Sequence, residues 1–410
     1  MTTRRTRITR IAAPAVVLVL ACGCASSAGP APIASSVAPS EASRPSPASE
    51  PFQSGRYTVG SDESRVVDLL ADGTAYLTAS PPEQPWITTR DQYQVTGDTV
   101  TFAGETCDGA EGTYRWVADA RRLELSVVDD SCTDRSALLG QPLTRLPEQL
   151  PYLSLEPSAA VLTSDLNQSS VDGKDRFFTT GGTGVSEYDR DGALIASLAE
   201  NLTFPVGVTV EPDGRLYVAN FDDATVHEYS ATGTPVRSWT VDGGNVGPTG
   251  LGHDAKGNVY VVLHRIHDHY VEKYSPNGRL LGTWASFGPG DGEVTGGDDS
   301  GPEELAVAPD GASYVADFGN HRLVKFLPDG TFAYNLTGDG THPLTDAFVV
   351  ECDPSGDVFT LSLGTLWEFD ASGHVRGRWF SPYGGDIDID DAGNVFLVGR
   401  RVYGVTLPRS

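Results

Sequence analysis

The chain has 410 residues, enough for two domains, and 39% of them are hydrophobic, which suffices for a buried core. Its 46 glycines and 27 prolines favour many short strands joined by tight turns over long helices. The formal net charge of −26 repels phosphate backbones, so we expect no nucleic-acid partner. Cationic ligands, metal ions and basic proteins are compatible with this charge, as is a merely solvated acidic surface.

Residues 1–21 have the layout of an export signal. A head with four arginines precedes the apolar run from Ile11 to Ala21, which is too short for a membrane span of about 20 residues. A cysteine behind small and aliphatic residues resembles the lipobox of bacterial lipoproteins, in which that cysteine is acylated and becomes the mature N-terminus. We predict acylation at Cys22, with Cys24 as the alternative; ordinary secretion without a lipid also stays open.

Residues 22–53 consist mainly of Ala, Ser, Pro and Glu. Such a segment cannot offset the entropy of ordering, so we predict a disordered tether. A lipid at its start would hold the following domains at the outer face of the cell membrane. The scarcity of lysine beside many Ala, Gly, Asp and Arg residues is typical of an actinobacterial protein.

Residues 54–148 are predicted to form a small all-β domain. Alternating strands flank the tight turns Asp72-Gly73 and Gly97-Asp98, which is the signal of two hairpins. Cys107 and Cys132 are the only cysteines in this segment, and in an oxidising compartment we expect them to form a disulfide.

The run from Cys107 through Trp116 to Arg135 resembles a small lipocalin-like barrel of exported proteins. That resemblance implies a small apolar ligand inside the barrel. A barrel this short can instead be filled by its own side chains, and we expect the filled case.

From about residue 160 the chain repeats a pattern in which a dipeptide ending in glycine precedes an apolar strand. The dipeptides are Asp172-Gly173, Asp213-Gly214, Lys256-Gly257, Asp310-Gly311, Ser355-Gly356 and Ala392-Gly393. A period near 40 residues with two hairpin turns per period is what four-stranded propeller blades require. One blade cannot bury its faces alone, so neighbours must stack into a closed ring. Residues 149–410 are therefore predicted to form a six-bladed β-propeller.

Two segments of this region carry a family resemblance. Residues 306–326, which contain Pro309-Asp310-Gly311 and Asn320-His321-Arg322, closely resemble the NHL repeat, and residues 204–229 are a second good copy. The resemblance spans about residues 160–408 and implies an NHL-like propeller.

The last repeat holds only three strands before the chain ends, which would leave an open ladder edge in the ring. We predict that a segment near Tyr152–Leu162 supplies the fourth strand and ties the two ends of the propeller together. Cys352 falls in a predicted inner strand, where we expect a buried free thiol that behaves as a small hydrophobic residue.

Three histidines, His264, His267 and His269, lie within six residues between two predicted strands. Imidazoles in this spacing can bind a transition metal. Consecutive residues of a turn point in different directions, however, which favours a surface loop without a metal.

The innermost strand of each blade begins near the central channel. The residues expected there are Gly207, Gly250, Glu304, Asp386, Asp165 and Asp346. Acidic residues at such positions resemble those with which propeller lyases and lactonases hold a divalent ion. Glycine at two of the six positions leaves that pattern incomplete.

Two functions are compatible with these features. The first is a non-catalytic binding module, monomeric and lipid-anchored, that takes a protein or a small molecule at a propeller face and needs no cofactor. The alternative is a metal-dependent enzyme, a lyase or an ester or lactone hydrolase, that works in the central channel. Three or more carboxylate, amide or imidazole groups converging there would favour the enzyme.

Overall fold

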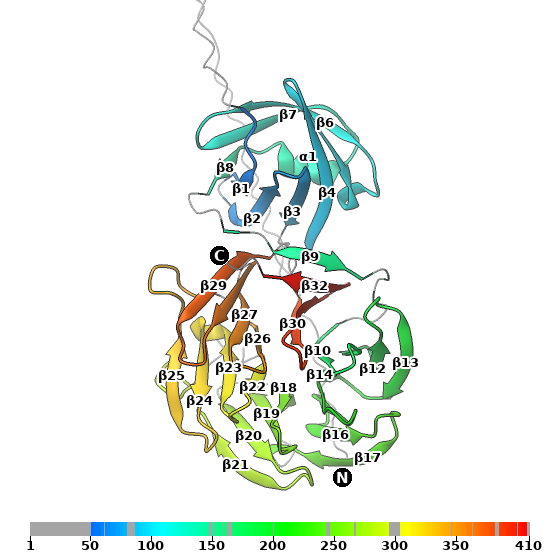
Figure 1. The fold of residues 1–410 in the computed structure, drawn as a ribbon, viewed down its shortest axis with the longest axis vertical. Coiled ribbons are helices and arrows are strands. Elements are labelled where there is room, and N and C mark those ends of the chain that lie inside the picture. The colour runs from blue at the N-terminus through cyan, green and yellow to red at the C-terminus, as the bar shows by residue number, and fades with distance from the viewer. Residues whose placement is uncertain are drawn as a thin grey trace, which may run out of the picture. The chain divides into compact units, whose positions relative to one another are not determined.

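The computed structural model describes residues 51–407, except for 61, 80–86, 147–149, 152, 159, 161, 163–165, 200, 243–246, 266–267, 295–303, 346, 363, 382–384 and 400. The predicted signal segment and almost all of the predicted tether, with Cys22 and Cys24, lie outside the described residues. The described part is nearly all β-structure, comprising one closed barrel and six four-stranded sheets (Figure 1). No helix in this part is long and apolar enough to cross a membrane.

The barrel has eight strands in up-and-down order. They are β1 (Gly55–Val59), β2 (Asp62–Leu69), β3 (Thr74–Ala79), β4 (Ile87–Thr96), β5 (Thr99–Gly104), β6 (Gly112–Ala118), β7 (Arg122–Asp130) and β8 (Leu143–Arg145). Each strand pairs antiparallel with the next, and β1 pairs with β8 to close the sheet. The predicted turns Asp72-Gly73 and Gly97-Asp98 join β2 to β3 and β4 to β5, as expected.

Side chains of the barrel strands fill its interior. Val67, Phe102 and Tyr114 are wholly buried, and Leu77 is only 2% exposed. The rings of Phe102 and Tyr114 meet edge to face with centroids 5.7 Å apart. The barrel core is therefore apolar and made by the chain itself, as expected for a barrel of this size.

The guanidinium of Arg135 is wholly buried in the barrel domain, together with the carboxylates that it pairs with. Arg135 lies in α1 (Thr133–Leu139), the helix between β7 and β8. Its Nη1 donates to Asp91 at 3.2 Å, and its Nε donates to Asp130 at 2.9 Å. Beside it, Cys107 and Cys132 form the predicted disulfide, with Cα atoms 6.0 Å apart. Ion pair and disulfide together tie α1 to the barrel wall.

The six blades each hold four antiparallel strands. From the innermost strand outward, blade 1 holds β10 (Ser169–Val171), β11 (Phe177–Gly181), β12 (Gly184–Tyr188) and β13 (Leu194–Ala199), and blade 2 holds β14 (Pro205–Val210), β15 (Leu216–Asn220), β16 (Thr225–Tyr229) and β17 (Pro235–Thr240). Blade 3 holds β18 (Gly247–His253), β19 (Val259–Arg265), β20 (Asp268–Tyr274) and β21 (Leu280–Trp284), and blade 4 holds β22 (Leu305–Val307), β23 (Ser313–Asp317), β24 (Arg322–Phe326) and β25 (Phe332–Leu336). Blade 5 holds β26 (Val349–Cys352), β27 (Val358–Ser362), β28 (Thr365–Phe369) and β29 (Val375–Phe380), and blade 6 holds β30 (Asp386–Ile389), β31 (Val395–Val398), β32 (Val402–Thr406) and β9 (Ser154–Pro157). The predicted six-bladed propeller is confirmed.

Blade 6 closes the ring in the predicted way. Its outermost strand, β9, precedes blade 1 in the sequence and pairs antiparallel with β32. In this pairing Leu155 of β9 lies opposite Val405 of β32. Leu155 also joins an apolar cluster with Trp379 of blade 5 and Leu397 of blade 6. The two ends of the propeller are thus held in one sheet.

Apolar clusters between neighbouring blades form the propeller core. Between blades 2 and 3, Tyr217 and Val226 pack with Leu251 and Val261. Between blades 1 and 6, the rings of Phe177 and Phe396 meet edge to face with centroids 5.1 Å apart. The inner strands contact their neighbours in the order β10, β14, β18, β22, β26 and β30, and β30 contacts β10. The inner strands therefore surround a central channel (Figure 1).

Candidate functional site

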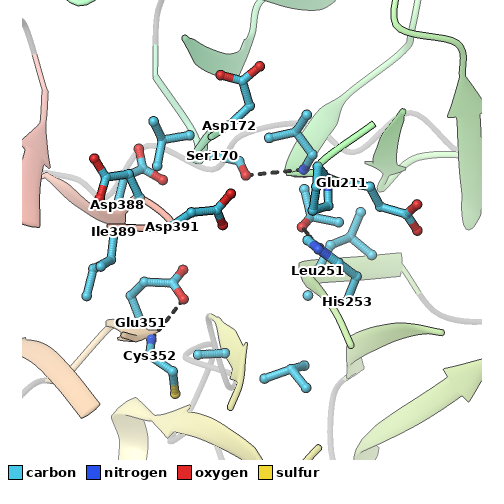
Figure 2. A pocket seen from close by; sticks show the side chains of 18 of the residues that line it. Ser170, Asp172, Glu211, Leu251, His253, Glu351, Cys352, Asp388, Ile389 and Asp391 are labelled. Atoms are coloured by element: carbon cyan, nitrogen blue, oxygen red, sulfur yellow. Dashed lines mark hydrogen bonds between the residues drawn. The ribbon is translucent and has the colours of Figure 1, made fainter. Parts of the chain in front are cut away.

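A cavity of about 470 Å³ lies in the channel, lined by the inner strands of all six blades (Figure 2). It occupies the end at which the inner strands finish and turn into the second strands, as lining residues such as Pro212, Pro309 and Pro354 show. From the sequence, the channel residues were expected at the other end, where the inner strands begin. The cavity lining therefore begins at Glu304 in blade 4, as expected, but beyond the expected residue in the other inner strands.

Six residues occupy equivalent positions in the inner-strand ladders at the closed side of this cavity. They are Gln168, Gly207, Gly250, Glu304, Val349 and Asp386. Gln168 belongs to blade 1 and Glu304 to blade 4, which are opposite blades of a six-membered ring. The Gln168 Nε2 nevertheless donates to Glu304 Oε1 at 2.7 Å, so this contact spans the channel. Gln168, Glu304 and Asp386 form what we call the floor of the cavity.

Glycine at position 207 makes the crossing possible. The Gln168 Oε1 accepts a hydrogen bond from the Val208 main-chain N–H at 3.1 Å, which draws the amide close to β14. A Cβ atom on Gly207 would lie 2.8 Å from that Oε1 and 3.3 Å from the Ala219 Cβ. Any larger residue here would push the Gln168 side chain out of its bridge.

Four carboxyl groups from blades 4 to 6 gather on one side of the channel: Glu304, Glu351, Asp386 and Asp388. We call these four residues the acidic side. Ser169 of blade 1 donates its main-chain N–H to Asp386 at 2.5 Å and its hydroxyl to Asp388 at 2.6 Å. The described residues that line the cavity include no Lys or Arg. The charges on the acidic side therefore face no lining cation.

Burial and mutual repulsion make these carboxyl groups hard to ionise. Burial, reinforced by the charge of Asp386, holds the pKa of Glu304 and of Asp388 well above the usual range. Burial raises the pKa of Asp386 to about 6, and burial with the nearby Asp386 charge raises that of Glu351 to about 8. Near neutral pH the acidic side is consequently neutralised in part by bound protons.

Carboxylates also lie in the turns that follow the inner strands of blades 1 to 3, and these have cationic partners. Asp172 pairs with Arg176 at 2.5 Å, and Glu211 pairs with Arg215 at 2.5 Å. In blade 3, Asp254 pairs with Lys273 at 3.2 Å. These cations compensate their carboxylates within each blade, so the uncompensated charge lies on blades 4 to 6.

Apolar and weakly polar side chains form the rest of the wall. Val171, Val307 and Ile389 line the cavity and are partly exposed. His253 is hydrogen-bonded through Nδ1 to the Thr209 hydroxyl at 2.8 Å, and burial lowers its pKa, which favours the neutral imidazole. The cavity is thus apolar over part of its wall and acidic on one side.

Cys352 lies in β26 with a free thiol, and the structure corrects one expectation about it. It lines the cavity and is partly exposed rather than fully buried. Burial, followed by the charge of Glu351, raises the pKa of its thiol well above the usual value. The thiol is therefore accessible but weakly nucleophilic at neutral pH.

The structure places the channel residues predicted from the sequence as follows. Glu304 and Asp386 meet in the floor, and Gly207 and Gly250 lie at the same level but inside β14 and β18 rather than at their first residues. Asp165 and Asp346 lie outside the described residues.

Glu351 and Asp388, two acidic residues of the cavity wall, were missed. Glu351 lies two residues after Val349, and Asp388 lies two residues after Asp386. Side chains two residues apart point to the same side of a strand, so both face the channel as Val349 and Asp386 do. Their signal in the sequence was a carboxylate in the middle of an apolar strand.

The histidine group is only partly described. His264 and His269 form a cross-strand pair in β19 and β20, with ring centroids 4.8 Å apart, and His267 lies outside the described residues. His269 is 2% exposed and His264 is partly exposed, so these two histidines lie at the ends of two paired strands rather than in an exposed loop.

A divalent metal does not fit the groups that can be placed. No three His, Cys, Asp or Glu side chains in the described part are arranged to hold a metal ion. Glu304 and Asp386 are already engaged by Gln168 and Ser169.

No family model and no curated protein matches the chain. Among solved structures it is similar to a streptogramin B lyase (11% identity, TM-score 0.46), over 62% of this chain and 98% of that one. It is also similar to a gluconolactonase from Xanthomonas campestris (17% identity, TM-score 0.45; 64% and 99%) and to virginiamycin B lyase from Staphylococcus aureus (9% identity, TM-score 0.44; 86% and 95%). At such identities and scores these likenesses carry no argument about function.

Proposed function

We propose that this chain is an exported, lipid-anchored protein of the outer cell surface whose NHL-type propeller binds a small molecule without changing it chemically. The observation that carries the proposal is the cavity of about 470 Å³ walled by six inner strands. Its volume lies in the range of small-molecule sites, and its mixture of apolar wall and a few polar groups is typical of them. The signal and tether predicted in residues 1–53 support the location.

Binding without catalysis is favoured by the chemistry of the lining. Thr209 and His253 form the only hydroxyl–imidazole pair among the described lining residues, and Thr209 is 6% exposed. A nucleophile must reach the substrate, which a buried hydroxyl does not. The high pKa of Cys352 leaves its thiol mostly protonated.

A cavity-filling variant tests the binding site. Val307 lines the cavity, so Val307→Trp should occupy the space of the ligand. Val236→Trp is the matched control, because Val236 is 48% exposed on the outer strand β17. In a thermal-shift screen of a small-molecule library, compounds that raise the Tm of the native protein and of Val236→Trp should leave Val307→Trp unchanged. Binding that survives Val307→Trp, or turnover of a bound compound, would contradict the proposal.

Fractionation of cells tests the anchor. Cys22→Ser should move the protein from the membrane fraction to the medium, whereas Cys24→Ser should leave it membrane-bound. The reverse pattern would move the acylation site to Cys24. If neither variant is released, the double variant Cys22→Ser/Cys24→Ser decides: its retention in the membrane fraction would exclude a lipid anchor.

A further inference from the structure

We propose that the ligand of this cavity is an amphipathic organic cation, whose ammonium group pairs with Glu351 while its apolar part lies against Val171, Val307 and Ile389. This inference rests on the proposed small-molecule function and names its ligand class. It follows from the placement of charge, from the free face of one carboxyl group, and from the apolar wall.

The charge is distributed unevenly around the cavity. In blades 1 to 3 the turn carboxylates have Arg or Lys partners within 3.2 Å. On the acidic side, by contrast, hydrogen-bond donors are main-chain N–H groups, Ser169 and Gln168, all of them neutral. A cleft with one sign of charge and low-polarity walls concentrates ligands of the opposite sign. A bound cation would supply the acidic side with the counter-charge that the turn carboxylates of blades 1 to 3 take from Arg or Lys.

Glu351 is the member of the acidic side that offers an oxygen to a ligand. Its Oε1 accepts the Cys352 main-chain N–H at 2.8 Å, and this is the only hydrogen bond of its carboxyl group among the described residues. Figure 2 shows the carboxyl group pointing from β26 into the space between the blades. Glu304, Asp386 and Asp388 are instead occupied by Gln168, Ser169 or main-chain groups. Among these four carboxyl groups, Glu351 therefore has the freest oxygen for an ammonium group, and the exposed Asp391 adds negative charge to the same cavity wall.

Apolar side chains next to this carboxyl group exclude a bare, fully hydrated ion as the best match. Val307 of blade 4, Ile389 of blade 6 and Val171 of blade 1 line the same cavity. Burying apolar ligand surface against them stabilises the complex. An organic ammonium satisfies both parts of the wall.

Cation binding and proton binding compete at Glu351. Its nearest titratable neighbours are Glu304, Asp386, Asp388 and Cys352. Other titratable side chains line the same cavity: Asp172, Glu211, His253, Asp254, Asp353, Asp390 and Asp391. Its carboxyl group has a pKa of about 8 in the unliganded protein, so an ammonium ion must displace a proton below that pH. The preference for cations should accordingly increase as the pH rises through 8.

The free thiol of Cys352 provides the test, because it lies in the cavity beside Glu351. Two methanethiosulfonates of similar size, one carrying a trimethylammonium group and one a sulfonate, each convert a thiol into a mixed disulfide with release of methanesulfinate. Their rates at Cys352 are measured at pH 9 by mass spectrometry of the peptide that contains it, in the full chain. The exposed residue Ser238 supplies the reference as Ser238→Cys in a Cys352→Ser background, which corrects for reagent reactivity and overall charge.

The cationic reagent should modify Cys352 at least about tenfold faster than the anionic one, relative to the reference thiol. The ratio should fall several-fold at pH 6.5 and in Glu351→Gln, and Glu351→Gln should remove most of the pH dependence. Equal corrected rates would overturn the cationic ligand while leaving an open cavity. Failure of both reagents to modify Cys352 would instead show a closed cavity and refute the small-molecule function itself.

Calcium distinguishes an inorganic from an organic cation. Millimolar Ca²⁺ should change the rate ratio no more at Cys352 than at the reference thiol. If Ca²⁺ abolishes the preference for the cationic reagent at Cys352 but not at the reference thiol, and EDTA restores it, the site binds a divalent ion. That result would overturn the assignment to an organic ligand.

Discussion

The barrel and the propeller channel both bury carboxylates, and they neutralise them in opposite ways. In the barrel, Asp91 and Asp130 share the guanidinium of Arg135, and all three side chains are wholly buried. In the channel, four carboxyl groups gather on the acidic side without a lining cation.

The pKa values follow this difference. Burial alone would raise the pKa of Asp130, but hydrogen bonds from Arg135 and Tyr114 hold it below the usual value. The pKa of Glu351 rises to about 8, since no cation offsets its burial. A buried carboxylate that is paired with an Arg of the same protein stabilises the fold. A buried carboxyl group that binds a proton instead of a cationic side chain can exchange that proton for a cationic ligand.

The largest expected effect comes from removing the barrel counter-ion. Arg135→Met would leave Asp91 and Asp130 buried without a partner, which should lower the free energy of unfolding by about 3–5 kcal/mol. The matched control is Arg115→Met, since Arg115 pairs with Asp98 at the surface with side chains 64% and 73% exposed. That control should cost less than about 1 kcal/mol in urea denaturation. Equal losses would break the contrast between the two regions.

The disulfide of the barrel should rank next. Replacing Cys107 and Cys132 together by Ser opens a loop with a sequence separation of 25 residues. The chain-entropy model gives a loss of about 3 kcal/mol for such a loop. Cys352→Ser is the control for loss of a sulfur atom, and reductant should destabilise only proteins that retain the disulfide. Unchanged denaturation of the double variant would show that Arg135 alone secures α1.

A substitution in β9, the outermost strand of blade 6, should weaken the closure of the propeller ring. Leu155→Asp places a carboxylate in the apolar cluster with Trp379 and Leu397, and should cost about 1–3 kcal/mol. Its neighbour Glu156 is exposed, so Glu156→Gln should be nearly neutral. Thermal unfolding of the propeller reports the difference. If the two variants unfold alike, β9 contributes little to closure.

The smallest effect is a pH dependence of propeller stability. Glu351 holds its proton more tightly when folded, with a pKa of about 8 against an ordinary 4.5. Its contribution is therefore fully present below about pH 4.5 and is lost as the pH rises through 8. The Tm should fall by a few degrees, roughly 2–4 °C per kcal/mol, between pH 6 and pH 9. Calorimetry of Glu351→Gln should show a shallower fall, whereas Glu124→Gln, a change at an exposed barrel residue, should not.

Much of the fold could be predicted because its signals are local. The turn at Lys256-Gly257 shows why: Gly257 adopts a φ of +74°, and the Asp254 carboxylate accepts the main-chain N–H groups of Lys256 and Asn258. Such a turn is specified by a few consecutive residues and recurs wherever they do. The disulfide and the pairing of the chain ends followed from equally simple requirements, two cysteines in one small domain and one missing strand.

The candidate site was predicted only in part. Glu304 and Asp386 were identified from their place at the start of inner strands, and the structure brings both into the floor. Gln168 was not singled out, because a glutamine gives no sign in the sequence that it will cross a channel. Its partner lies 136 positions away in the opposite blade.

By itself, the sequence determined the number of blades, the positions of their turns, the disulfide and the strand that closes the ring, because alternation and turn chemistry act over a few residues. Only the tertiary structure decided which polar side chains share the channel. That outcome depends on the register of six inner strands and on the room that Gly207 leaves for the Gln168 side chain, and neither can be read from any one segment. The unpaired charge of Glu351 is a property of the closed ring, since it exists only where blades 4, 5 and 6 meet.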